Sequence, residues 1–304
     1  MTNVYLDPDH SDDERRRRLY AGDLYVHAAR PSTVALAQWA QQMVRDAFAP
    51  HDPLTAQYDL PVEAWVERFA PVKPAFIHHP HTRELLLDVF TDLGCDLEQT
   101  YLDVPRLRGV TSDGYLTSGV GFAHHPHRDT WYSAPACQVN WWMPLWPVEA
   151  ESGMAFHPRY FAEAVPNGSA HFDYYEWNAT SRKDAARHIH GDSRKQPKPE
   201  TPLELEPDLR VMTPPGGVLA FSPSHLHSTV PNTLGTTRFS IDIRTVHAGD
   251  VAARRGAPNV DAQPRGTSLR DFTLGPDRLP MPEDLVGPYD VGSTSTGPRV
   301  FRPV

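Results

Sequence analysis

The chain has 304 residues, of which 39% are hydrophobic and 22% are charged. These values are ordinary for a soluble globular protein, and the length suffices for one large domain or two small ones. The formal net charge of −9 gives no overall field that would attract nucleic acid, and no apolar run approaches the roughly 20 residues that span a bilayer. The 31 prolines disfavour a helix bundle and predict many turns, strand ends and loops.

The N-terminal stretch is polar and lacks the apolar segment of a signal peptide. The two cysteines, Cys95 and Cys137, do not suggest a disulfide framework. We therefore expect a cytoplasmic protein that acts on a small molecule, without a nucleic-acid or membrane partner. The sequence indicates no oligomeric state.

A helical pattern occupies residues 11–48. Ser11 precedes three acidic residues, as the N-cap of a helix does. The run Arg15–Arg18 follows, and we interpret it as a solvated helix face in preference to an anion site.

Two further helices are expected before the strands begin. One opens with Ser32 or Thr33 as its cap, because apolar residues then recur near the helical period. The other covers residues 81–94, with Gly94 as its stop signal.

From about residue 105 the pattern changes to short strands separated by Pro, Gly, Ser or Asn. The predicted strand segments are residues 111–122, 137–146, 152–158, 216–223 and 237–246. Several short strands preceded by helices favour a mainly β, α+β fold, a barrel or sandwich with helical support.

A single domain is expected over residues 1–304. Residues 1–104 would be mainly helical support and residues 105–246 the β core, with 247–304 a Pro- and Gly-rich wrapping segment. Residues 159–210 form a polar, aromatic insertion without a clear period, and its stretch 181–198 holds six Lys or Arg against two Asp. We interpret this insertion as a lid or specificity loop.

A metal site is predicted at two histidine clusters. His127 and Asp129 are two residues apart, so on a strand an imidazole and a carboxylate would point to the same side. His227, from another strand, would complete a two-histidine, one-carboxylate set. Such a set leaves coordination positions open and suits Fe(II) for oxygen activation, although zinc accepts the same ligands. His225 is the alternative to His227.

The residues around His227 resemble those of a known family. Residues 215–221 are predicted to form a turn that leads into a buried strand. His227 follows six residues after this segment, Asn232 comes next, and Arg238 lies eleven residues after His227. This order resembles the phytanoyl-CoA dioxygenase-like family of Fe(II)/2-oxoglutarate-dependent oxygenases. In that family an iron-binding histidine, an asparagine and a 2-oxoglutarate-binding arginine follow one another in this way.

A second segment carries the same resemblance. Residues 151–158 look like the family's Asn-Gly-x-Leu strand and its following turn, with Ser152 where the family often has Asn. The departure concerns a turn contact and leaves the metal ligands unchanged. The resemblance covers roughly residues 105–246.

The resemblance implies a double-stranded β-helix core, also called a jelly-roll or cupin-like core. It implies Fe(II), 2-oxoglutarate as co-substrate and O2, with no catalytic residues beyond the metal ligands. Arg238 would hold the distal carboxylate of 2-oxoglutarate, since guanidinium is an always-charged, bidentate partner for a buried carboxylate. Thr229, Gln138 and Asn140 are further candidates for binding this co-substrate. Because Asp129 supplies the carboxylate, the halogenase variant of the superfamily is not expected.

Alternation along residues 238–244 supports the role of Arg238. Phe239, Ile241 and Ile243 share one face of this strand, and Arg238 shares the other face with polar residues. A polar face inside a barrel is unfavourable unless the interior holds charged ligands. The structural alternatives for Arg238 are an ion pair with Asp242 and a role at the surface.

Aromatic residues near the predicted site are candidates for substrate contact. These candidates are Trp131, Tyr132, Tyr175 and Trp177. The expected reaction is hydroxylation, desaturation or oxidative cyclisation of a small polar metabolite in natural-product tailoring. The competing interpretations are a 2-oxoglutarate-independent metal cupin enzyme and a non-catalytic barrel that binds small molecules.

Overall fold

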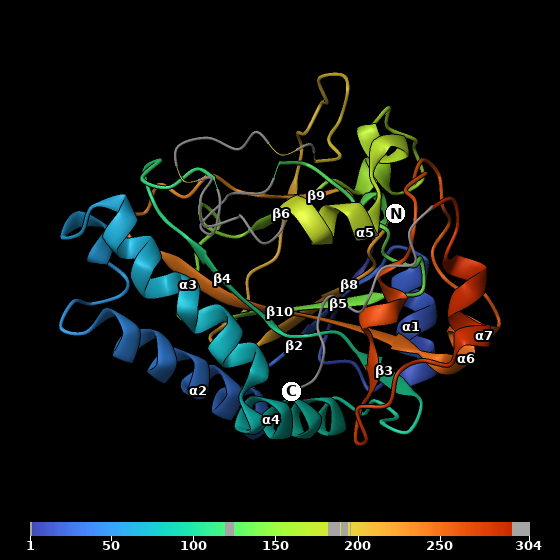
Figure 1. Cartoon of the computed structure of the whole chain (residues 1–304), viewed down its shortest axis with the longest axis horizontal. Helices are drawn as coiled ribbons and strands as arrows, with labels where there is room; N and C mark the ends of the chain where they lie inside the picture. Colours follow the sequence, from blue (N-terminus) through green and yellow to red (C-terminus); the bar gives the residue numbers. More distant parts are fainter. Residues whose placement is uncertain (1, 119–124, 182–188, 190–193, 195, 294–304) are drawn as a thin grey trace.

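The computed structural model describes residues 2–118, 125–181, 189, 194 and 196–293. Two β-sheets face each other, and helices cover the outer face of the larger one (Figure 1). No helix of the described part is long and apolar enough to cross a membrane. The mixed α+β class predicted from the sequence is present, while the double-stranded β-helix topology and the domain boundaries stay predictions.

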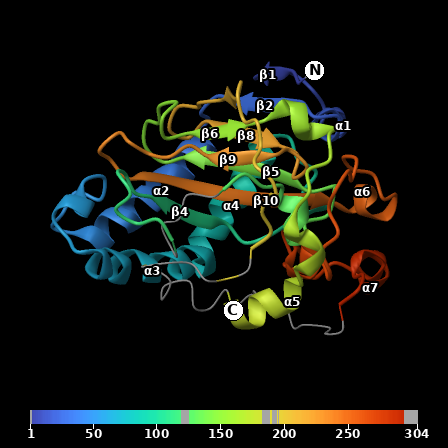
Figure 2. The ribbon, with the colours of Figure 1, turned by 90° about the horizontal axis from the view of Figure 1, so that it is seen from above.

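The larger sheet has β10 (Arg238–His247) near its middle, as Figure 2 shows from above. Its strand order is β1-β2-β8-β5-β10-β3-β11, and β4 also pairs with β10. The other strands of this sheet are β1 (Val4–Leu6), β2 (Leu24–His27), β3 (Thr100–Leu102), β4 (Arg106–Val110), β5 (Val139–Pro144), β8 (Val218–Phe221) and β11 (Thr273–Leu274).

The smaller sheet consists of three antiparallel strands in the order β7-β6-β9. These strands are β7 (Leu209–Arg210), β6 (Met154–Phe156) and β9 (His227–Thr229). An isolated bridge between His127 and His227 extends this sheet by one residue pair. Phe156 of β6 packs against Phe221 of β8, so an apolar contact joins the two sheets.

The four N-terminal helices bury apolar side chains against the larger sheet. The four helices are α1 (Asp12–Tyr20), α2 (Pro31–Phe48), α3 (Val62–His78) and α4 (Pro80–Asp92). Side chains of α2, α3 and α4 form one buried cluster with Phe239, Ile241 and Ile243 of β10. This confirms the predicted apolar face of that strand, and burial of so many large side chains is the main stabilising term of the fold.

The helical region differs from the prediction in three places. β2 interrupts the pattern expected over residues 11–48, and α3 was not predicted because it contains Pro71 and Pro74. The N-cap of α2 is Arg30, with Pro31 in the first turn, so the expected Ser32 or Thr33 cap is wrong. Thr33 nevertheless accepts a hydrogen bond from the Arg30 backbone N–H at 2.8 Å.

Other helix predictions hold. The Ser11 hydroxyl accepts from the Glu14 backbone N–H at 3.3 Å, as an N-cap does. Helix α4 ends at Asp92, and Gly94 follows with φ of 71°, a left-handed conformation that suits glycine.

The arginine run of α1 is only half solvated, so its interpretation as a solvated face is wrong for two members. Arg15 and Arg16 are buried, whereas the side chain of Arg17 is 62% exposed. Arg16 pairs with Asp250 at 2.6 Å, which ties α1 to the C-terminal region. Burial of these cations is possible because carboxylates lie beside them.

The segment predicted as a strand at residues 111–122 is also placed differently. The strand is β4, which ends at Val110, and residues 111–118 form turns and irregular backbone. The remaining residues of that prediction, 119–122, lie outside the described part of the chain.

Short elements make up the insertion and the C-terminal region. In the insertion they are the 3-10 helices Pro158–Phe161 and Gly168–His171, α5 (Tyr174–Glu176) and a π-helical turn at Trp177–Ser181. Most of its basic stretch lies outside the described residues, and its role as a lid stays a prediction. The C-terminal region holds α6 (Ala248–Ala252), the 3-10 helix Ser268–Asp271, α7 (Glu283–Val286) and the 3-10 helix Gly287–Tyr289.

Candidate metal centre and its cavity

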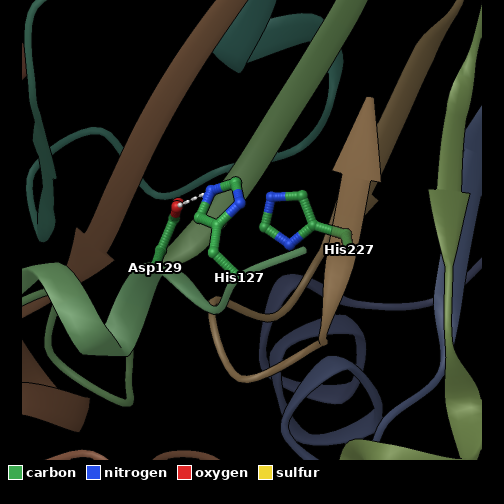
Figure 3. A group of neighbouring side chains, drawn as sticks. All are labelled: His127, Asp129 and His227. Carbon is green, nitrogen blue, oxygen red and sulfur yellow. Dashed lines mark ion pairs between the residues drawn. The ribbon is translucent and has the colours of Figure 1, made fainter. Parts of the chain in front are cut away.

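Three side chains with metal-binding chemistry meet between the two sheets. One ligand atom each of His127, Asp129 and His227 lies within 4.8 Å of the others (Figure 3). The two imidazole ring centroids are 4.4 Å apart, and His127 Nε2 is 3.5 Å from Asp129 Oδ1. All three residues are buried.

Backbone hydrogen bonds fix the two histidines beside each other. The N–H of each donates to the carbonyl of the other at 3.0 Å. Each Nδ1 also lies beside a backbone carbonyl two residues earlier, that of His125 for His127 at 2.9 Å and that of His225 for His227 at 3.0 Å. With Nδ1 carrying the proton, Nε2 of both rings presents a lone pair toward the centre.

Asp129 reaches the same centre by a different local structure from the predicted strand. Its backbone N–H donates to the Pro223 carbonyl at 3.0 Å, and it begins a 3-10 helix, Asp129–Tyr132. The His-x-Asp spacing therefore brings the two side chains together at a bridge that is followed by a tight turn, without a regular strand.

A polar network orients the carboxylate of Asp129. Its Oδ2 accepts from Asn140 Nδ2 at 2.9 Å and from Gln138 Nε2 at 3.4 Å, and lies 3.5 Å from Arg244 Nη2. Gln138 also donates to Asn140 Oδ1 at 2.6 Å. The two amides proposed for 2-oxoglutarate therefore contact the carboxylate of Asp129.

The protonation states suit metal binding. Burial alone would raise the pKa of Asp129, but Arg244 and the two neighbouring histidines outweigh it and hold that pKa well below its usual range. Burial and the nearby His127 lower the pKa of His227 to about 4. A carboxylate and a neutral imidazole are the forms that bind metal ions.

Arg238 lies buried on β10 without a carboxylate partner among the described residues. Its Nη1 donates to the backbone carbonyls of Ser152 and Gly153 at 2.7 and 3.0 Å, and its Nε has no hydrogen-bond partner there. Its guanidinium lies 5.7 Å from the ring centroid of Trp142. Burial lowers the pKa of Arg238 to about 10, so the side chain still carries its charge at neutral pH.

The predicted alternative for Arg238, an ion pair with Asp242, is not formed. Asp242 pairs with Arg108 of β4 at 2.6 Å. Arg244 instead makes the internal ion pairs, 3.5 Å from Asp129 and 3.8 Å from Asp103. A buried guanidinium without a counter-ion is costly, which favours an anionic ligand at Arg238.

A cavity of about 680 Å³ contains the three-residue cluster and Arg238 in its wall. Among the predicted site residues, Thr229, Asn140, Tyr132 and Trp177 also line it, whereas Gln138 lies behind its wall. A cavity of this size matches the usual range for small-molecule sites.

Two predicted substrate contacts lie elsewhere. Trp131 turns away from the cavity, is fully buried, and donates from its ring nitrogen to Asp261 at 2.8 Å. Tyr175 does not line the cavity, and its hydroxyl donates to Asp290 at 2.9 Å. The backbone forms a 3-10 turn from Asp129 onward, and residues two apart in such a turn point in different directions. The side chain of Trp131 therefore points away from that of Asp129.

His225 is the alternative ligand that the geometry does not bring to the cluster. Its ring is completely buried against Phe156 and Phe161, with centroid distances of 5.7 and 4.7 Å. Burial lowers the pKa of His225 to about 3. The residue serves as packing for the strand end that carries His227.

The two other family-like positions have structural contacts. The Ser152 hydroxyl donates to the Glu149 carbonyl at 3.4 Å, so a turn contact persists without an asparagine. Asn232 donates to the Val110 and Thr236 carbonyls at 3.1 and 2.7 Å, which holds the turn before β10 against β4.

Sequence reasoning missed several residues of the cavity wall. Arg106 and Arg108 alternate along β4 in the same way as the predicted polar face of β10, and this spacing could have identified them. Phe172 and Lys73 also line the cavity. No sequence signal marks them, because they enter from the insertion and from the unpredicted helix α3.

No family model matches the chain, and no curated protein matches it. Among solved structures, EvdO2 from Micromonospora carbonacea var. aurantiaca is 13% identical over 79% of this chain and 92% of that one, with a TM-score of 0.44. SnoN, a non-heme alpha ketoglutarate dependent epimerase from nogalamycin biosynthesis, is 14% identical over 78% and 85%, with a TM-score of 0.40. ThoJ, a non-heme monooxygenase, is 16% identical over 72% and 71%, with a TM-score of 0.37. At these values the similarities assign neither a family nor a function.

Proposed function

We propose that this chain is an Fe(II)/2-oxoglutarate-dependent oxygenase that oxidises a small organic molecule. The observation that carries the proposal is one cavity that holds both a two-histidine, one-carboxylate cluster and a buried arginine without a carboxylate partner among the described residues. The cluster suits a divalent metal with open coordination positions, and the arginine suits an organic carboxylate.

The residues present fit both groups. His127 and His227 would bind the metal through Nε2, since their Nδ1 atoms lie beside backbone carbonyls, and Asp129 would bind through Oδ1, since its Oδ2 accepts from Asn140. Arg238 would hold the distal carboxylate of 2-oxoglutarate through its guanidinium edge that faces the cavity. Thr229 lines the same wall and would donate its hydroxyl to that carboxylate.

When bound, iron and 2-oxoglutarate supply oxidising chemistry with O2 that protein side chains cannot provide. The side chains of this chain bind, orient and exclude water. Asn140, Gln138 and Arg244 hold the Asp129 carboxylate in one orientation. Tyr132 packs edge-on to His127 at a centroid distance of 5.6 Å, which limits water access beside the metal position.

The part of the proposal that concerns natural-product tailoring by hydroxylation, desaturation or cyclisation depends on the resemblance of residues 105–246 to the phytanoyl-CoA dioxygenase-like family. That family is broad in what it oxidises, so phytanoyl-CoA is not the proposed substrate.

Conversion of 2-oxoglutarate to succinate tests the proposal directly. Purified protein with Fe(II), ascorbate and 2-oxoglutarate is incubated in air with a panel of metabolites, and succinate is quantified by mass spectrometry. We expect succinate above background that rises with one class of metabolite and is absent in Asp129→Ala. Succinate formation equal in the wild type and in Asp129→Ala, or none under any condition, would overturn it.

A further inference from the structure

We propose that the substrate is an organic anion with a flat apolar body, whose carboxylate or phosphate is bound by Arg108 and its neighbouring cations; this deepens the proposed function and rests on it. Among the described residues, the cavity wall contains six cationic side chains: Lys73, Arg106, Arg108, Arg194, Arg238 and Arg244. Two carboxylates, Asp129 and Asp242, lie in the same wall. This balance contrasts with the net charge of −9 for the whole chain.

The register of β4 and β10 explains why four of these cations face the cavity together. Arg106 and Arg108 of β4 lie opposite Asp242 and Ser240 of β10, so their side chains emerge on the same face as Arg238 and Arg244. Two adjacent strands therefore present a strip of guanidinium groups to the cavity. Arginine is the residue best matched to carboxylate and phosphate groups.

Binding of the metal and its co-substrate does not neutralise the excess positive charge of these side chains. Fe(II) carries two positive charges and 2-oxoglutarate two negative ones, so their joint binding leaves the charge balance of the wall unchanged. Asp103 lies behind Arg106 and Arg244, at 2.7 and 3.8 Å, and offsets one further charge. Counted over the described residues alone, the wall stays net positive, and an excess of one sign of charge in a cavity attracts ligands of the other sign.

Arg108 has the most exposed side chain of the four strand arginines in the wall. Its Nε is taken by Asp242 at 2.6 Å, while its side chain keeps 28% of its surface exposed beside the cavity. Arg106 and Arg238 also line the cavity, but their side chains are less exposed. A guanidinium has five N–H donors, so one ion pair leaves donors for a ligand.

An aromatic wall suits the body of the proposed substrate. Tyr132 packs on His127, Phe172 packs on Tyr132 at 5.3 Å, and Trp177 packs on Phe172 at 5.8 Å between ring centroids. All four line the cavity, so the wall runs from the metal cluster to Trp177. Arg194 lies 5.4 Å from the centroid of Trp177, which joins the aromatic wall to the cationic lining. A flat apolar body along this wall would lie beside the metal position.

Matched probes test the inference. Binding of 1-naphthyl phosphate, 1-naphthoate and neutral 1-naphthol is measured by equilibrium dialysis against anaerobic protein loaded with Fe(II) and 2-oxoglutarate. We expect both anions to bind at least about tenfold more tightly than 1-naphthol. Their affinity should fall when salt rises from about 50 to about 500 mM, while that of 1-naphthol should not. The phosphate and carboxylate arms decide which anion the site prefers.

Three variants locate the site. Arg108→Gln should weaken anion binding about tenfold and leave the binding of 1-naphthol unchanged. Arg108→Lys should retain most of the anion affinity. Arg17→Gln, at a remote and exposed position, should bind all three probes as the wild type does. Equal affinity of 1-naphthol and the anions in the wild type would overturn the inference even if Arg108→Gln failed to fold. So would unchanged anion binding in a folded Arg108→Gln.

The same samples separate this inference from the proposed function. Binding of 2-oxoglutarate to the Fe(II)-loaded protein tests the function, and the naphthyl probes test the anion site. If 2-oxoglutarate binds and the anions do not, only the substrate class is wrong. If the anions bind through Arg108 without any binding of 2-oxoglutarate, the proposed function is wrong and Arg108 remains an anion site.

Discussion

Asp129 illustrates how much of a metal site depends on residues that are not ligands. One carboxylate oxygen faces His127, and the other accepts from Asn140 and Gln138 and lies near Arg244. Because that second oxygen is occupied, the first is left for the metal, and the carboxylate cannot rotate freely. Removal of such a supporting contact typically lowers metal affinity by about 10- to 100-fold.

Asn140→Ala tests this support. Loss of the 2.9 Å hydrogen bond to Asp129 should weaken Fe(II) binding by roughly tenfold to a hundredfold, as measured by anaerobic competition with a chelator. Asn259→Ala, in an exposed loop, is the matched control and should bind Fe(II) as the wild type does. An unchanged affinity in Asn140→Ala would mean that its amide does not position the carboxylate.

Arg238→Met tests the role of the buried guanidinium. Removal of its charge should raise the Kd for 2-oxoglutarate by at least about tenfold, because hydrogen bonds to charged groups contribute about 1.5–3 kcal/mol. Arg238→Lys should lie between Arg238→Met and the wild type, since lysine keeps the charge but not the fork. Fe(II) affinity should not change in either variant. If 2-oxoglutarate binds Arg238→Met as tightly as the wild type, its carboxylate is held elsewhere.

At the scale of elements, β2 shows how a strand can make stability depend on pH. His27 ends this strand, is 3% exposed, and stacks on Trp141 of β5 at 6.4 Å. Neither ring nitrogen has a hydrogen-bond partner among the described residues. Burial, together with the nearby Arg15 and Arg30, lowers the pKa of His27 to about 4, and Asp7 partly opposes this shift.

Stability should therefore fall as the solution is acidified. Above pH of about 6.5, the ordinary pKa, His27 is neutral in both states and contributes no pH dependence. Between about pH 6.5 and about pH 4, His27 takes up a proton in the unfolded chain but stays neutral in the folded chain. The free energy of unfolding therefore falls as the pH is lowered through this window, and His27 accounts for at most about 3 kcal/mol of the decrease. His27→Phe should flatten that part of the profile in urea titrations, whereas the exposed His81→Gln should not. A profile for His27→Phe as steep as that of the wild type would contradict this account.

The elements that could be predicted were those with a strong local signal. Residues 81–94 have helical periodicity and a closing glycine, and residues 238–244 alternate, so both matched the structure closely. Helix α3 was hidden by Pro71 and Pro74, whose cost is offset by burial of Trp65, Phe69 and Phe76. That burial is a tertiary effect, which a local pattern cannot report.

The same distinction holds within the site. His127, Asp129 and His227 could be predicted because ligand chemistry restricts their types and spacing, and the structure brings them together. Arg238 lines the same cavity, and its role stays a prediction. Trp131 was proposed because it is close to Asp129 in sequence, but after the 3-10 turn its ring nitrogen donates to Asp261 and it does not line the cavity. Most of the remaining wall comes from segments distant in sequence, so only the fold brings it together.

At the scale of the whole molecule, charge is separated between surface and cavity. The chain has a net charge of −9, but the described residues that line the cavity around the metal cluster include more cations than carboxylates. Burying such charges without function would cost stability, since each must be removed from water. A cluster of charges in a cavity that stability alone does not favour is expected of a functional site.

One measurement tests the central claim most directly, the visible spectrum of anaerobic protein titrated with Fe(II) and then with 2-oxoglutarate. We predict a weak metal-to-ligand charge-transfer band that saturates at one 2-oxoglutarate per chain. It should be absent in Asp129→Ala and should need more 2-oxoglutarate in Arg238→Met. Fe(II) binding without any band, or a band that persists unchanged in Asp129→Ala, would contradict the account.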